Sequence, residues 1–180
     1  MMDYKIIELD LKKIQANGAV VSRKKIAKLY RQEFTKKVED YLEKQIGLKI
    51  NYEKCPRDKN GNLKKIKDWF INVSHSGRYL AVVVSKEKEV GIDIERIENS
   101  ELLKDGERRV RRVASCGEQK IRGNYLNNYV IKESYAKMLG LGLGIGFKRL
   151  DANKLLEKKE CRFKNLSCDD YICYVCENKL

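Results

Sequence analysis

The chain has 180 residues, and its 39 lysines and arginines outnumber its 26 aspartates and glutamates, which gives a formal net charge of +13. With 42% hydrophobic residues and a single proline, the composition is globular, and a chain of this length buries a core as one domain or as two small ones. Because no stretch approaches the roughly 20 apolar residues of a membrane span, and the first residues lack the hydrophobic core of a secretory signal, we expect a cytoplasmic protein.

The first half of the sequence predicts one long helix among several short strands. Residues 4–9 alternate enough to form a strand. From residue 22 to residue 45, apolar residues recur every three or four positions without glycine or proline, which indicates a helix with one apolar face. Further strands are expected at residues 49–53, 69–73 and 79–85, the last of which contains three consecutive valines.

The second half repeats this mixture of a helix and strands. A short charged link joins residues 79–85 to a strand at 90–94, which favours a hairpin between the two. A charged helical pattern follows residue 97, and a clearer helix is expected at 125–139, closed by Gly140. Short strands are expected at residues 147–150, 161–163 and 171–176.

The coarse likeness of the halves predicts an α+β fold of two similar lobes. Each lobe would be a long helix packed on a small antiparallel sheet. We place the boundary so that residues 1–88 form the first lobe and residues 89–180 the second.

Four of the six cysteines lie near the end of the chain, between Cys161 and Cys176. Cys173 and Cys176 have the spacing of a zinc-binding pair. However, residues 171–176 have the pattern of a strand, and free cysteine behaves as a small buried hydrophobic residue. We therefore interpret these cysteines as core residues.

Two acidic residues, Asp93 and Glu95, lie two positions apart on the strand expected at 90–94. Both side chains therefore leave the same face of that strand. Adjacent like charges are unfavourable unless water or a cation separates them, and Mg²⁺ takes carboxylate oxygens at about 2.1 Å. The pattern fits a magnesium site, and it also fits a solvent-exposed edge strand.

Three charged residues, Lys132, Glu133 and Lys137, lie on the second expected helix. Glu133 and Lys137 are four residues apart, so an ordinary helical ion pair explains them. Alternatively, Glu133 is a third metal ligand or a general base and a lysine contacts a phosphate.

His75 is the only histidine, and it lies between Ser74 and Ser76 in a polar segment that follows a strand. Histidine in a protein interior is often a structural residue with satisfied hydrogen bonds. The neighbouring serines offer hydroxyl and amide donors for phosphate oxygens. A serine nucleophile is not favoured, because the Gly-x-Ser-x-Gly motif of hydrolases is absent.

Three segments, Asn72–Gly77, Gly91–Glu95 and Lys132–Lys137, closely resemble the motifs of the 4′-phosphopantetheinyl transferase superfamily in order and spacing. The sequences Ser-His-Ser, Gly-Ile-Asp-Ile-Glu and Lys-Glu-Ser-Tyr-Ala-Lys are similar to those of its surfactin-synthetase-activating (Sfp-like) branch. The resemblance covers residues 70–150. The family usually has tryptophan where this chain has Tyr129, and its upstream Gly-Lys-Pro segment is absent here.

The resemblance implies transfer of 4′-phosphopantetheine from coenzyme A to a serine of an acyl or peptidyl carrier protein, with release of 3′,5′-ADP. Mg²⁺ would be the cofactor, and the enzyme would be a monomer whose two lobes form a pseudo-dimer. The carrier would be acidic, in keeping with the positive charge of this chain, and no membrane is implied.

The resemblance also implies roles for single residues. The metal ligands would be Asp93, Glu95 and Glu133, with Glu133 also taking the proton of the carrier serine. Lys137 would lie near the reacting phosphate, and His75 would contact phosphates of coenzyme A. Further coenzyme contacts would come from Ser74, Lys132, an upstream lysine such as Lys54 or Lys59, and Arg23, Lys24 or Arg31.

Two other functions compete with this interpretation. The net charge and the basic run at residues 108–112 suggest nucleic-acid binding, although no helix-turn-helix, zinc-finger or ribonucleoprotein signature accompanies them. A non-catalytic scaffold of the same fold would lack coenzyme binding, and the complete carboxylate set argues against it.

Overall fold

The computed structural model describes residues 2–10, 23–47, 49–63, 65–97, 118–141 and 149–179. The first lobe contains two helical segments and three strands: β1 (Met2–Glu8), α2 (Arg23–Ile46), the short 3₁₀ helix η1 (Tyr52–Lys54), β2 (Phe70–Ser76) and β3 (Tyr79–Ser85). The second contains β4 (Val90–Arg96), α3 (Glu118–Met138), α4 (Ala152–Leu156), β5 (Cys161–Asn165) and β6 (Tyr171–Asn178).

The strands form two antiparallel sheets of three strands each, so the fold is mixed α/β as the sequence predicts. In the first sheet the order is β1-β3-β2, and in the second it is β4-β6-β5. In both, the last strand along the chain lies in the middle. Each half therefore runs strand, helix, then a pair of adjacent strands, in the same spatial order.

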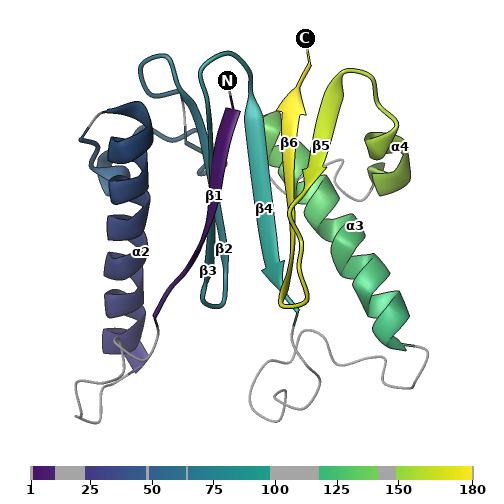
Figure 1. Ribbon diagram of the computed structural model, residues 1–180, viewed down its shortest axis with the longest axis horizontal. Helices are drawn as coiled ribbons and strands as arrows, with labels where there is room; N and C mark the ends of the chain where they lie inside the picture. The colour runs from purple at the N-terminus through teal and green to yellow at the C-terminus, as the bar shows by residue number, and fades with distance from the viewer. Residues whose placement is uncertain are drawn as a thin grey trace.

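The elements stack in four layers: α2, the first sheet, the second sheet and α3 (Figure 1). Alternate residues of β3 face opposite layers. Leu80, Val82 and Val84 pack toward α2, whereas Ala81 and Val83 pack against Ile92 and Ile94 of β4 in the core between the sheets. Both faces of β3 are thus covered, which explains why its sequence is continuously apolar.

Helix α3 approaches β4 closely because position 91 is glycine. A Cβ atom there would lie 2.0 Å from the carbonyl oxygen of Ser134 and 2.4 Å from the amide nitrogen of Met138. Both of these atoms belong to the helix backbone, which does not move aside as a flexible side chain does. Gly91 therefore sets how near the residues of α3 lie to those of β4.

Several expected elements agree with the structure. Strand β3 has the expected bounds, and the two long helices cover the expected positions. Helix α3 ends at Met138, and Gly140 follows it with a positive φ of 66°. The amide of Leu141 donates to the carbonyl of Ala136, 2.8 Å away, so Gly140 closes the helix as expected.

Three expectations are wrong. Residues 49–53 do not form a strand, because Asn51 caps the short 3₁₀ helix η1 instead. Strand β2 continues through the polar segment to Ser76, since its backbone remains paired with β3 there. β3 and β4 do not form a hairpin: they belong to different sheets, and β3 pairs with β2 and β1. The helical pattern after residue 97 and the strand expected from residue 147 lie wholly or largely outside the described residues.

The cysteines that the structure describes are free thiols. Cys161, Cys173 and Cys176 are buried, and the Sγ atom of Cys176 lies 3.5 Å from the sulfur of Met138. They are core residues as interpreted, whereas Cys168 is exposed. In the described parts of the chain, no helix is long and apolar enough to cross a membrane.

Candidate active site

Strand β2 lies between two groups of functional side chains because its residues alternate in direction. Asn72, Ser74 and Ser76 bond to β4, while Val73 and His75 line a cavity under α2. The Oδ1 atom of Asn72 accepts the amide hydrogen of Ile92 at 3.1 Å. Side chains thus join the edges of the two sheets at this seam, where no backbone ladder between β2 and β4 is formed.

Asp93 is the centre of the first group and is only 3% exposed. Its Oδ1 atom accepts hydrogen bonds from the Ser74 hydroxyl at 2.8 Å and from the Lys137 ammonium at 2.6 Å. The same ammonium donates to Ser74 Oγ at 2.9 Å. A strand of each sheet and helix α3 therefore meet at one carboxylate oxygen.

The second oxygen of Asp93 has no hydrogen-bond partner. Among the buried side-chain nitrogen and oxygen atoms that the structure describes, Oδ2 of Asp93 is the one without a partner. Buried polar atoms in folded proteins are nearly always satisfied by protein, water or a ligand. The unpaired atom therefore indicates a place where a hydrogen-bond donor or a cation fits.

Glu133, one turn of α3 before Lys137, is also buried. The hydroxyl of Tyr129 donates to its Oε1 atom at 3.0 Å. Burial and the charges of Asp93 and Glu95 raise the pKa of Glu133, against the opposing effects of the Tyr129 hydrogen bond and the Lys137 charge. A carboxylate whose pKa is raised toward neutrality is a better general base.

Glu95 is held by the seam, since Ser76 donates to its Oε2 atom at 2.7 Å. Within the described residues, no group of three or more histidine, cysteine, aspartate or glutamate side chains is arranged to hold a metal ion. The unpaired oxygen of Asp93 and the neighbouring carboxylate charges nevertheless fit a divalent cation. The three-carboxylate magnesium site thus stays a prediction.

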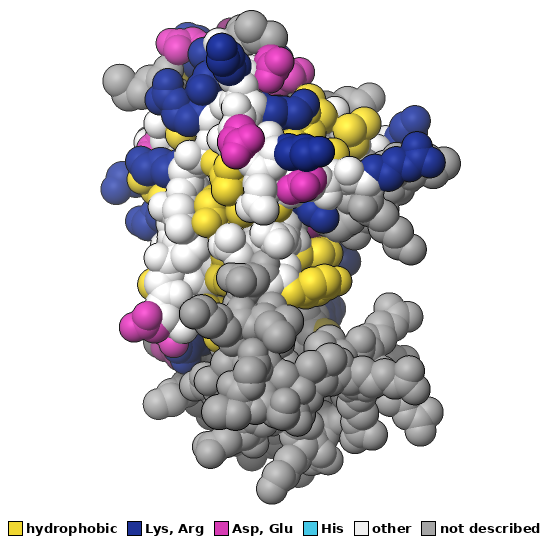
Figure 2. All heavy atoms as spheres, turned by 90° about the vertical axis from the view of Figure 1, so that its right-hand side faces the viewer, with side chains coloured by type: hydrophobic (Ala, Val, Ile, Leu, Met, Phe, Trp, Pro, Cys, Tyr) yellow, Lys and Arg dark blue, Asp and Glu magenta, His cyan; other side chains and the backbone are white. Residues whose placement is uncertain are grey.

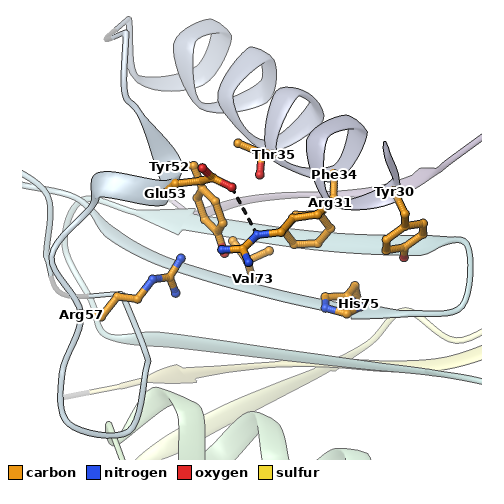
Figure 3. A pocket seen from close by; sticks show the side chains of 9 residues that line it. All are labelled: Tyr30, Arg31, Phe34, Thr35, Tyr52, Glu53, Arg57, Val73 and His75. Carbon is orange, nitrogen blue, oxygen red and sulfur yellow. Dashed lines mark ion pairs between the residues drawn. The ribbon is translucent and has the colours of Figure 1, made fainter. Parts of the chain in front are cut away.

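The second group lines a cavity of about 480 Å³ between α2, β2 and the segment around η1 (Figure 3). Its walls are aromatic and its charged groups are mainly basic, and it is lined by Tyr30, Arg31, Phe34, Thr35, Tyr52, Glu53, Arg57, Val73 and His75. The guanidinium of Arg57 lies 4.9 Å from the centre of the Tyr52 ring, a cation–π contact. Arg31 forms an ion pair with Glu53 at 3.2 Å.

His75 packs edge-on against Phe34, with ring centres 4.9 Å apart. Partial burial and the charge of Lys137 lower the pKa of His75, so the ring is neutral at pH 7. The effect of Lys137 also shows that the cavity and the carboxylate group lie within electrostatic range of each other. An anion in contact with both would therefore feel His75 and Lys137 together.

The structure brings together Ser74, Asp93, Glu133 and Lys137, which the sequence places far apart. Lys132 is half-buried on α3, about 100° around the helix from Glu133.

Around the cavity, the expected contacts are met only in part. Arg31 lines it as suggested, but Lys54 is exposed and neither Lys54 nor Lys59 is among its lining residues. Arg57 takes this place and was missed by sequence reasoning, although it is the first basic residue after the single proline. The side chains of Arg23 and Lys24, like the basic run at 108–112, lie outside what the structure describes.

The chain was compared with family models and with curated proteins, and none of them matches it.

Proposed function

We propose that this protein transfers the 4′-phosphopantetheine group of coenzyme A to a serine of an acyl or peptidyl carrier protein, releasing 3′,5′-ADP. One observation carries the proposal. Consecutive residues of β2, Ser74 and His75, connect a buried Asp93–Lys137–Glu133 group with a basic, aromatic cavity. Such a pair of sites suits a nucleotide at one end and a reacting pyrophosphate at the other.

The cavity has the chemistry for the phosphoadenosine end of the coenzyme. Aromatic rings of Phe34 and Tyr52 offer faces and edges for the adenine, and Arg31 and Arg57 offer cations for the 3′-phosphate. His75 and Lys137 are placed to contact the pyrophosphate.

In the proposed reaction, the hydroxyl oxygen of the carrier serine forms a bond to the phosphorus that bears pantetheine. The bond from this phosphorus to the bridging oxygen breaks, and 3′,5′-ADP leaves with the electron pair. Glu133 accepts the serine proton, and the Tyr129 hydroxyl holds its carboxylate in place. Lys137 offsets charge on the phosphate oxygens.

Mg²⁺ is the proposed cofactor, to be held by Asp93, Glu95 and Glu133. When bound, it would supply charge neutralisation and alignment for phosphoryl transfer. All three residues lie on β4 and α3, whose spacing is set by Gly91.

The remaining parts of the proposal concern assembly and location. The repeated strand order of the two lobes supports a monomer built as a pseudo-dimer. The net charge of +13 supports an acidic carrier as the partner. The free thiols of the described cysteines are in keeping with the reducing cytoplasm.

A nucleic-acid partner is less favoured by the described surface. Figure 2 shows that lysines and arginines alternate with acidic side chains on the face formed by α3 and α4, with hydrophobic side chains between them. A nucleic-acid groove is typically a continuous basic stripe.

The test is the intact mass of an apo-carrier protein after incubation with coenzyme A, Mg²⁺ and this protein. We expect the carrier to gain the mass of phosphopantetheine, and chelator to prevent it. Glu133→Gln keeps an acceptor for Tyr129 but removes the base, so labelling should slow by about 100-fold or more. Glu157→Gln, at an exposed position after α4, is the matched control and should label normally. No gain of mass with the unaltered protein on any carrier type would refute the transfer.

A further inference from the structure

The ammonium of Lys137 lies in the position where a metal ion would otherwise neutralise Asp93. It is 2.6 Å from Oδ1 of Asp93 and 2.9 Å from Ser74 Oγ. The Asp93 side chain is 5% exposed, so its charge has little contact with water. A buried carboxylate of this kind needs a cation partner, and here the partner comes from α3.

Asp93 also retains capacity for a second cation. Its Oδ2 atom is buried without a hydrogen-bond partner, although the whole side chain lies in a packed seam. If the ammonium were the permanent and only partner, both oxygens would be expected to be satisfied. One oxygen is therefore occupied by Lys137 while the other stays available.

A divalent ion on Oδ2 and an ammonium on Oδ1 would repel each other across a single carboxylate in a region of low dielectric. The longer and more flexible of the two attachments is the lysine side chain, which is 21% exposed and ends near the seam. The metal is therefore expected to displace Lys137 rather than to bind beside it.

We propose that Lys137 is an exchangeable counter-ion: its ammonium holds Asp93 in the metal-free protein, and a divalent metal bound by Asp93 displaces it. The displaced ammonium is then available to the phosphate of the coenzyme. This inference rests on the proposed function for its metal and its phosphate ligand. It assigns to Lys137 a second role, that of stabilising the carboxylate site before the metal arrives.

The test measures binding of Mn²⁺ alone, by calorimetry, without coenzyme or carrier. Lys137→Met removes the competing charge and keeps the length of the side chain, so we expect Mn²⁺ to bind about tenfold more tightly or better. Lys154→Met, at an exposed position on α4, is the control for loss of one positive charge and should bind as the unaltered protein does. Asp93→Asn should abolish binding, both alone and combined with Lys137→Met.

A stability measurement covers the case in which Lys137→Met folds poorly without metal. Its melting temperature should be low in chelator and should rise with Mn²⁺ by more than that of the unaltered protein. Ser74→Ala removes one acceptor of the ammonium but keeps the ion pair, so it should tighten Mn²⁺ binding by a smaller factor.

Equal or weaker Mn²⁺ binding by Lys137→Met would overturn the inference, as would the absence of Mn²⁺ binding in every variant. Failure of the proposed transfer is a separate result, because the Mn²⁺ titration contains neither coenzyme nor carrier. A protein that exchanges Lys137 for Mn²⁺ but labels no carrier would keep this inference and lose the proposed reaction.

Discussion

The two lobes share one strand order but differ in how their helices meet their sheets. The second residue of β1, Asp3, and the second residue of β4, Gly91, occupy corresponding positions. Asp3 carries a side chain that accepts a hydrogen bond from Tyr41 of α2 at 3.3 Å. Gly91 carries none, and the backbone of α3 takes the space.

The consequences of this difference are found on either side of β2. Under α2, aromatic side chains keep the helix away from β2 and leave the cavity of about 480 Å³ (Figure 3). Under α3, close contact places Glu133 and Lys137 against Asp93. The same arrangement of elements thus gives a hollow in one lobe and a packed charged group in the other, and the difference depends on side-chain size at the helix–sheet contact.

The largest expected effect comes from removing that difference. Gly91→Ala would place a Cβ atom 2.0 Å from the Ser134 carbonyl oxygen, which a helix backbone can relieve only by moving α3. We expect the free energy of unfolding to fall by roughly 3 kcal/mol or more. Urea denaturation followed by circular dichroism measures it.

Asp3→Ala is the matched variant in the other lobe. It deletes a side chain where space for one exists, and it should cost only about 1 kcal/mol for the lost hydrogen bond to Tyr41. Similar losses for Gly91→Ala and Asp3→Ala would remove the proposed contrast between the lobes.

A smaller effect is expected at the seam between β2 and β4. Asn72 is 5% exposed and accepts the amide hydrogen of Ile92, so Asn72→Ala leaves a buried donor unsatisfied. We expect a loss of about 1–3 kcal/mol in the free energy of unfolding. Asn153→Ala, at an exposed position on α4, should change it by less than about 0.5 kcal/mol. Equal values for the two would show that the seam contributes nothing.

The smallest effect concerns the pH dependence of stability through His75. Its pKa in the folded protein is below its ordinary value of 6.5, so on acidification the unfolded chain binds a proton first. The contribution of His75 is therefore fully present above about pH 6.5 and declines as the pH falls below it. Unfolding at pH 7.5 and pH 5.5 should show a larger loss for the unaltered protein than for His75→Leu. An identical loss would place the ring in an environment that does not alter its pKa.

Local patterns predicted much of the fold. Three consecutive valines in β3 and the helical spacing of apolar residues in α2 depend on burial along one segment, which a sequence shows directly. The pairing of strands does not: a short link between β3 and β4 suggested a hairpin, but the partners of β3 lie further along the chain in both directions.

The candidate site divides in the same way. Asp93 and Glu95 were predicted to share a face because strand geometry fixes it. The contact between Lys137 and Asp93 depends on how α3 crosses β4, and Arg57 reaches the cavity through a turn whose path no local pattern specifies. The charge that Lys137 places on Asp93 could be seen only once helix and strand were together.

The central claim is that one reaction uses both sides of β2, and steady-state kinetics with varied coenzyme A test it most directly. Arg57→Met removes a cation of the cavity and should raise KM for coenzyme A about tenfold with kcat nearly unchanged, while Glu133→Gln should lower kcat by about 100-fold or more with KM nearly unchanged. Arg162→Met, at an exposed position on β5, should change neither. An unchanged KM for Arg57→Met would contradict the account, as would an undiminished kcat for Glu133→Gln.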